Sequence, residues 1–128
     1  MISDLAAHSR VWLARPAGYL LGAPEARLLE AIERAGSIKE AAVAAAMSYR
    51  TAWARVREME RVLGRPVVRS RAGGPGGGAT TLTDDARGLV SLFHDLDQRV
   101  TEHAHREFTR VIQPPPSRPL AHFDTNAT

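Results

Sequence analysis

The stretch from Gly36 to Arg71 constrains the fold of this chain most, because two helical segments follow each other closely and a strand comes directly after them. Ser37 and Glu40 make a Ser-x-x-Glu capping box, which predicts the start of a short alanine-rich helix. A second, amphipathic helix is expected over residues 49–63, and residues 66–71 have the character of a strand. This order predicts a helix-turn-helix followed by a β-wing, an arrangement that places one helix in the major groove of DNA.

The second of these helices is expected to have one buried and one exposed face. Apolar residues recur at helical spacing and predict a buried stripe made of Ala52, Val56, Met59 and Leu63. The opposite face carries Arg50, Ala54, Arg57 and Arg61. Ser48 is the expected N-cap. The first turn then offers four side chains at or near the surface, those of Tyr49, Arg50, Thr51 and Trp53.

Short strands are expected on both sides of the helical region. Val11–Leu13 and Tyr19–Leu21 lie either side of a proline-glycine turn signal and predict an N-terminal β-hairpin. Pro24 suits the first position of the helix that comes next. Residues 66–82 are β-prone at both ends and rich in glycine between them, which predicts the two strands and the tip of a wing. The expected fold is therefore mostly α-helical with small β elements.

A long helix is expected to close the folded part of the chain. Thr83 is its predicted N-cap, and the aspartates that follow suit the positive end of the helix dipole. If the helix spans residues 84–112, it is roughly 40 Å long at ~1.5 Å per residue. One domain cannot cover so long an apolar stripe, so a homodimer is predicted. Its interface residues would be Leu89, Phe93, Leu96, Val100, Ala104 and Phe108. The alternative is that the stripe packs on its own domain.

The domain organisation follows from this helix and from the proline run after it. Residues 1–113 are expected to form one winged helix-turn-helix domain that includes the dimerisation helix at 84–112. Three consecutive prolines begin at Pro114 and stop the helix. Residues 114–128 are expected to be a disordered, proline-rich tail.

Charge is distributed unevenly along the chain. Between Arg50 and Arg71 there are seven arginines and two glutamates, whereas Asp84 to Glu107 holds six acidic residues and three arginines. A basic patch beside an acidic face is typical of a nucleic-acid-binding protein, although solvation alone can account for such asymmetry. The chain has no cysteine, which excludes disulfides and thiolate metal sites. No apolar run approaches the roughly 20 residues of a membrane span.

Several runs resemble one family of regulators. Gly36–Ile38, Ala41–Ala42 and Met47–Trp53 are similar to the N-terminal DNA-binding domain of molybdate-responsive ModE-type transcriptional regulators, as is the glycine wing followed by Leu82–Thr83. Ser48 to Pro66 also fits the broader LysR-type pattern, in which the recognition helix ends in Leu-Gly-x-Pro. The resemblance covers about Val11 to Leu96. It implies a winged helix-turn-helix domain that binds DNA and regulates transcription.

The resemblance also sets expectations about ligands and partners. In the full-length family, C-terminal oxyanion-binding domains of the Mop type sense molybdate, and this chain ends before such a domain. We therefore expect no cofactor and no direct molybdate sensing. Double-stranded DNA and a second copy of the chain are the expected partners, with a separate sensor protein or small effector as a further possibility. No membrane partner is expected, and the expected location is cytoplasmic.

Physical reasoning assigns roles to the residues expected to contact DNA. Arg50 is the first choice for reading a base, because a guanidinium pairs bidentately with guanine. Thr51 and Ala54 can contact a thymine methyl group, and Tyr49 can contact phosphate or sugar. For Trp53, packing is favoured over base contact. Arg57 and Lys39 are expected to contact phosphate, and Arg69 and Arg71 the flanking minor groove or backbone. The remaining candidates for DNA binding are Ser48, Gly76 and Gly77.

Other function classes receive less support. A winged-helix module that binds another protein through its long helix is the main alternative to a DNA-binding regulator, and a small oxyanion- or metal-binding protein is a distant third. The glycine-rich segment lacks the Gly-Lys-Ser/Thr ending of a phosphate-binding loop. His103 and His105 are two residues apart on a helix and point to different sides, so they cannot hold one metal together. We find no catalytic constellation and expect no enzyme.

Overall fold

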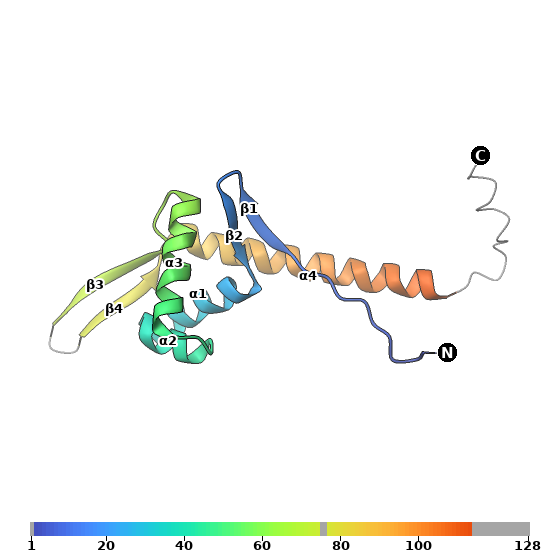
Figure 1. Cartoon of the computed structure of the whole chain (residues 1–128), viewed down its shortest axis with the longest axis horizontal. Coiled ribbons are helices and arrows are strands. Elements are labelled where there is room, and N and C mark those ends of the chain that lie inside the picture. Colours follow the sequence, from blue (N-terminus) through green and yellow to red (C-terminus); the bar gives the residue numbers. More distant parts are fainter. Residues whose placement is uncertain (1, 75–76, 114–128) are drawn as a thin grey trace. The chain divides into compact units, whose positions relative to one another are not determined.

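The computed structural model describes residues 2–74 and 77–113. Along the chain the elements are β1 (Trp12–Arg15), β2 (Gly18–Gly22), α1 (Ala23–Ala35), α2 (Ile38–Ala44), α3 (Tyr49–Leu63), β3 (Val68–Gly74), β4 (Gly77–Leu82) and α4 (Asp84–Ile112). Figure 1 shows α3 with the β3–β4 wing extending from it. The described residues form two compact units, one over 10–98 and one that combines 2–9 with 99–113. The predicted mostly helical fold with a small N-terminal hairpin and a long last helix is confirmed.

The strands form two separate antiparallel hairpins. In the first hairpin, Trp12 pairs with Gly22 and Arg15 with Gly18. In the wing, Val68 pairs with Leu82 at the base. The wing is also fastened to α1, because the backbone N–H of Thr80 donates to the carbonyl of Gly36 at 2.8 Å. The wing therefore leaves the helical body from a fixed base.

Both helices of the helix-turn-helix have capping residues. The hydroxyl of Ser37 accepts a hydrogen bond from the backbone N–H of Glu40 at 3.1 Å, which fixes the start of α2. The α3 helix has the predicted bounds and ends at Gly64, whose φ of 75° is left-handed and therefore favours glycine. One expectation shifts by a residue: α1 begins at Ala23 with Gly22 as N-cap, so Pro24 occupies the second helical position and not the first.

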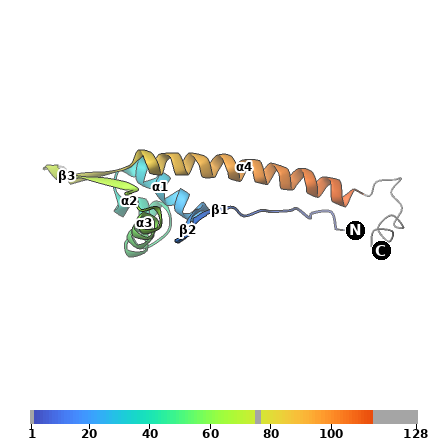
Figure 2. The same cartoon turned by 90° about the horizontal axis from the view of Figure 1, so that it is seen from above.

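The core lies among β2, α1, α2, α3, the base of the wing and the first turns of α4. Its largest fully buried side chains are those of Phe93, Leu21, Leu28, Leu29, Ile32, Met59, Val56 and Val67. Figure 2 shows α1 between α3 and the first turns of α4. The buried stripe of α3 differs at one position from the prediction, because Val62 is buried where Leu63 was expected and Leu63 is only half-buried.

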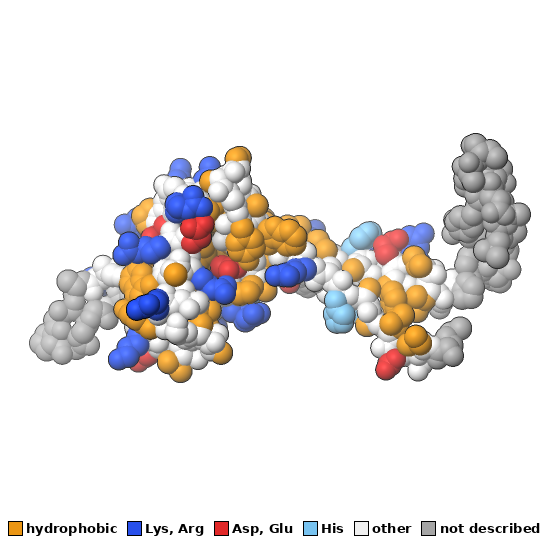
Figure 3. Space-filling view, in the orientation of Figure 1, with side chains coloured by type: hydrophobic (Ala, Val, Ile, Leu, Met, Phe, Trp, Pro, Cys, Tyr) orange, Lys and Arg blue, Asp and Glu red, His pale blue; other side chains and the backbone are white. Residues whose placement is uncertain are grey.

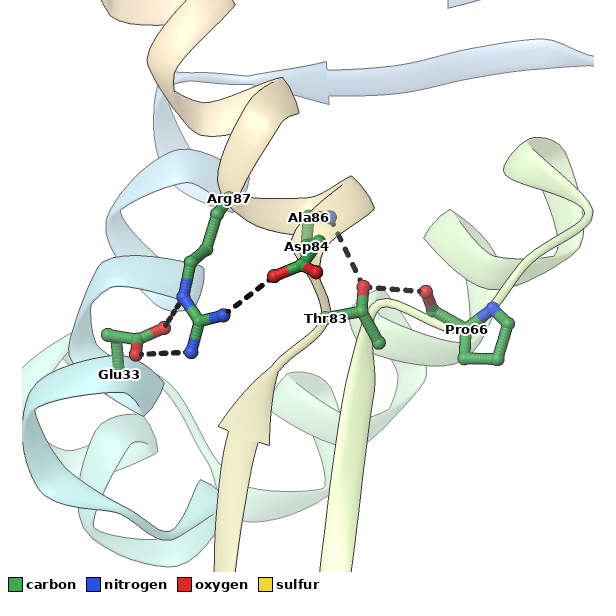
Figure 4. Close-up of polar contacts among 6 residues, drawn as sticks. All are labelled: Glu33, Pro66, Thr83, Asp84, Ala86 and Arg87. Carbon is green, nitrogen blue, oxygen red and sulfur yellow. Dashed lines mark hydrogen bonds and ion pairs between the residues drawn. The ribbon is translucent and has the colours of Figure 1, made fainter.

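Polar contacts join the base of the wing to the start of α4 (Figure 4). The hydroxyl of Thr83 donates to the carbonyl of Pro66 at 2.9 Å and accepts from the backbone N–H of Ala86 at 3.2 Å. Arg87 binds Glu33 of α1 through two nitrogens, at 3.0 and 3.2 Å. The first turn of α4 is thereby connected to both the wing and α1.

The structure corrects one part of the predicted dimer stripe. Phe93 has only 2% of its surface exposed and belongs to the core of the 10–98 unit, and Leu89 is half-buried against the same core. The alternative that the stripe packs on its own domain therefore holds for this part of α4. Periodicity identified the apolar face correctly but did not reveal that α1 and the wing base cover its beginning.

The second compact unit combines the N-terminal segment 2–9 with the end of α4 from Arg99 onward. Within it, Val100, Ala104 and Phe108 are half-buried, whereas Ile2, Leu5 and Val111 are exposed. The expected tail over 114–128 lies outside the described residues. No helix in the described ranges is both long and apolar enough to cross a membrane.

Candidate nucleic-acid interface

The N-terminus of α3 is fixed by its own cap. The hydroxyl of Ser48 accepts from the backbone N–H of Thr51 at 3.0 Å and donates to the Thr51 hydroxyl at 2.9 Å. These contacts use the hydroxyl of Ser48 and the acceptor of the Thr51 hydroxyl locally. Ser48 and Thr51 therefore define where the first turn of α3 begins, and the methyl group and the O–H donor of Thr51 are left for an outside contact.

Most of the α3 residues expected to contact DNA share one exposed side of the helix. Tyr49, Arg50, Ala54 and Arg57 are exposed, and Trp53 is half-buried against the core. The Tyr49 and Trp53 rings meet edge to face, with 6.4 Å between centroids. The guanidinium carbon Cζ of Arg57 lies 5.2 Å from the centroid of the Trp53 ring. This geometry is compatible with the expected packing role of Trp53, and it leaves the guanidinium of Arg57 exposed.

The arginines of this region divide into two groups by their partners. Three are paired with carboxylates inside the chain: Arg55 with Glu25 at 2.8 Å, Arg61 with Glu58 at 2.7 Å and Arg65 with Asp85 at 3.4 Å. Among the described residues, Arg50, Arg57 and Arg69 have no such carboxylate partner. Figure 3 shows basic side chains gathered over the part of the molecule that holds α3. The second group is the one whose charge is available to phosphate.

The wing and α2 add further positive charge. Arg69 and Arg71 are both exposed and two residues apart on β3, so they lie on the same side of the strand. Lys39 is exposed in the first turn of α2. Gly77 is the first residue of β4, whereas Gly76 lies outside the described residues. The candidates thus come from α2, α3 and the wing, the three elements that follow one another from Ser37 to Leu82.

A buried carboxylate that the sequence did not single out ties α3 to the N-terminal hairpin. Glu25 is 6% exposed; its Oε2 accepts from Nη1 of Arg55 at 2.8 Å, and its Oε1 accepts from the Gly22 backbone N–H at 2.9 Å and from the Tyr19 hydroxyl. Burial, together with the hydrogen bond to Glu25, raises the pKa of Tyr19 to about 12. One signal for Glu25 was available, because a glutamate three residues after an N-cap often bonds back to it.

Gly22 is required by this arrangement. A Cβ at this position would lie 2.5 Å from the Tyr19 hydroxyl, so any larger residue would displace the group that bonds Glu25. The hairpin, α1 and α3 therefore meet at one buried polar centre. That centre holds the middle of α3, through Arg55, while the exposed side of the helix stays available.

The acidic and histidine side chains of the described residues do not gather into a metal site. Within 2–74 and 77–113, there is no group of three or more His, Asp or Glu side chains placed to hold a metal ion. His94 instead bonds Glu30 of α1, with 2.8 Å between Nε2 and Oε2. The arrangement supports binding of an extended anionic surface.

Comparison with known proteins agrees with this geometry. Residues 25–87 match the family described as bacterial regulatory helix-turn-helix protein, lysR family. The chain is 42% identical over 78 residues to the transcriptional regulator ModE of Haemophilus influenzae, covering 61% of this chain and 30% of that protein. It is 40% identical over 89 residues to the molybdenum transport protein ModE of Azotobacter vinelandii, covering 70% and 33%.

A third relative gives the same picture. The chain is 37% identical over 71 residues to the DNA-binding transcriptional dual regulator ModE of Escherichia coli, covering 56% of this chain and 27% of that protein. The chain thus spans about a third of the length of these relatives. The matched region runs from α1 through the start of α4 and includes the whole candidate interface. Residues 25–87 therefore contain a helix-turn-helix domain of the LysR type.

Proposed function

We propose that this chain is a sequence-specific DNA-binding transcriptional regulator that acts by binding and not by catalysis. The observation that carries the proposal is the division of the arginines on and around α3. Arg55, Arg61 and Arg65 are paired within the chain, whereas Arg50, Arg57 and Arg69 are exposed and keep their charge. A side of a helix that carries unneutralised arginines is suited to the phosphates and base edges of duplex DNA.

In this mechanism α3 enters the major groove. Arg50 in its first turn reads a guanine, while Thr51 and Ala54 contact thymine methyl groups. Tyr49, Arg57 and Lys39 contact the sugar-phosphate backbone, and Arg69 and Arg71 on the wing reach the flanking backbone or minor groove. Displacement of counterions from phosphate supplies most of the nonspecific affinity, so the affinity should fall steeply with salt.

We further propose that the regulator binds as a homodimer through α4. Phe93 is excluded from that interface because it is a core residue, and Leu89 is half-covered by the core. Leu96 is 38% exposed, and Val100, Ala104 and Phe108 continue the same apolar side of the helix. A symmetric dimer would present two copies of α3 to half-sites about one helical turn apart. The cytoplasm is the compartment in which such a regulator would work.

The test is fluorescence anisotropy with a duplex selected from a random library, at two salt concentrations and with random competitor DNA. We expect binding that survives the competitor. Arg50→Ala should weaken the selected duplex by about 5- to 150-fold, the value of one bidentate base contact, and random DNA much less. Arg61→Ala is the matched control on the same helix, because Glu58 already neutralises that arginine. Equal binding of the selected duplex by Arg50→Ala would contradict its role in base reading.

Two further outcomes would point to other functions. If the chain binds no duplex even at low salt but binds another protein through α4, it is a protein-interaction module and not a DNA-binding regulator. Molybdate belongs in the assay because several relatives are named for molybdenum. We expect this chain alone to show the same affinity with and without it, and a molybdate-dependent change would contradict that expectation.

A further inference from the structure

We infer that Trp53 is a positioning residue, whose ring holds the guanidinium of Arg57 ready for a DNA phosphate without neutralising its charge. This inference rests on the proposed function. Tyr49, Trp53 and Arg57 are each four residues apart on α3, so their side chains follow one another along one side of the helix. They form a continuous ridge beside the position of Arg50.

The contact between Trp53 and Arg57 is close enough to fix the arginine. The guanidinium carbon of Arg57 lies 5.2 Å from the centroid of the indole ring, within the roughly 6 Å range of a cation–π interaction. Trp53 is half-buried and packs against the core, whereas Arg57 is exposed. The ring is therefore the anchored partner, and the guanidinium is the group whose freedom it limits.

Tyr49 supports the ring from the preceding turn. Its ring meets that of Trp53 at an interplanar angle of 86°, with centroids 6.4 Å apart, which is a favourable edge-to-face contact. Tyr49 thus has a structural use besides any contact with sugar or phosphate. The three side chains are ordered together before any partner arrives.

The other arginines on α3 show why a ring is suited to this task. Arg55 and Arg61 are held by Glu25 and Glu58, and each carboxylate cancels the charge that it positions. An aromatic face positions an arginine but leaves its full positive charge. Since a free arginine loses rotamer freedom when it is immobilised, partial ordering beforehand favours phosphate binding. Arg57 is therefore both oriented and charged.

A double-mutant cycle between Trp53 and Arg57 tests the inference, with DNA affinity as the measured quantity. Trp53→Leu should weaken binding by about 2- to 5-fold, in keeping with an exposed cation–π contact, and Trp53→Phe should weaken it less because an aromatic face remains. Arg57→Ala should remove about one phosphate contact from the salt dependence, a change of about 0.9 in slope. In the Arg57→Ala background, Trp53→Leu should have no further effect on affinity. The same substitution paired with Arg61→Ala is the control cycle and should be additive.

A second measurement is independent of DNA. In the unsubstituted chain, the Nε–H proton resonance of Arg57 should be shifted upfield by the ring current of Trp53, and Trp53→Leu should abolish that shift. If Trp53→Leu fails to fold, Trp53→Met replaces it in both measurements, because its adaptable apolar side chain can fill the same space without an aromatic face. Additive effects of Trp53 and Arg57 substitutions on DNA affinity would overturn this inference alone. Absence of DNA binding by the unsubstituted chain would overturn the proposed function, and this inference with it.

Discussion

The two parts of α4 obey the same sequence pattern and have different surroundings. Up to Gln98 the helix belongs to the 10–98 unit and buries Ala86, Val90 and Phe93 in its core. From Arg99 onward no described residue of the helix is fully buried, although Val100, Ala104 and Phe108 are half-covered. The beginning of the apolar stripe completes the core of the 10–98 unit, and its continuation is the surface that we propose for the dimer interface.

The polar contacts of the two parts differ in the same way. At the beginning of α4, Arg87 bonds Glu33 and His94 bonds Glu30, so both side chains join α4 to α1, and Arg87 also pairs with Asp84 within the helix. From Arg99 to the end of the described chain, the polar side-chain contacts are internal to the helix, between Arg110 and Glu107 and from the Thr109 hydroxyl to the His105 carbonyl. Contacts within one helix stabilise that helix but do not determine which other element packs against it.

The largest expected effect separates the core part of the stripe from the rest. Phe93→Ala removes a fully buried ring and should lower the free energy of unfolding by about 3–5 kcal/mol. Urea denaturation followed by circular dichroism measures it. Because Phe93 packs within one chain, the loss should be the same at low and high protein concentration. A loss that vanishes on dilution would place Phe93 in the dimer interface after all.

The second prediction concerns the continuation of the stripe. Val100→Asp combined with Phe108→Asp should convert the dimer to a monomer, because two charges would face an apolar partner. Sedimentation equilibrium at micromolar concentration measures the mass. Thr109→Asp is the matched control, since Thr109 is exposed and lies next to Phe108. A dimer that persists in the double variant would show that another surface joins the chains.

The contrast within α4 also shows how far the sequence could predict this molecule. The bounds of α3 and α4 follow from local signals, because Ser48 and Gly64 bracket one helix and Thr83 begins the other. The apolar stripe of α4 was equally visible. What covers each part of the stripe depends on the path of residues 23–82 in space, and periodicity carries no information about that path. For this reason the sequence pattern placed Phe93 in a dimer interface, whereas it packs in the core of its own chain.

The same reasoning applies to the candidate interface. Exposed arginines on the outer side of α3 could be predicted from helical spacing, but their partners could not. Glu25 and Arg55 are thirty residues apart and meet only because α1 packs beside α3. The division into paired and available arginines is thus a tertiary property. It is also the property that ranks Arg50 and Arg57 above Arg61 as DNA contacts.

A smaller effect is expected at the start of α4. Thr83→Ala removes the hydroxyl that accepts from Ala86 and donates to Pro66, and should cost about 1–2 kcal/mol in the free energy of unfolding. Thr83→Ser keeps the hydroxyl and should cost less. Urea denaturation of the two variants gives the comparison. If Thr83→Ser lost as much stability as Thr83→Ala, the methyl group and not the cap would be the important part of this side chain.

The smallest expected effect tests whether the polar contacts differ in kind between the two parts of α4. Arg87→Ala breaks a two-nitrogen contact with Glu33 on another helix and a pair with Asp84 within α4, and should lower the free energy of unfolding only slightly, because these side chains are exposed. Arg110→Ala breaks a pair within one helix and should cost at most about 0.5 kcal/mol. High salt should reduce both losses, because exposed ion pairs are screened. If the two substitutions lower the free energy of unfolding equally at low salt, the ion pair with α1 adds no stability beyond that of a pair within one helix. The burial of Phe93 and its neighbours would then be what distinguishes the beginning of α4 from its continuation.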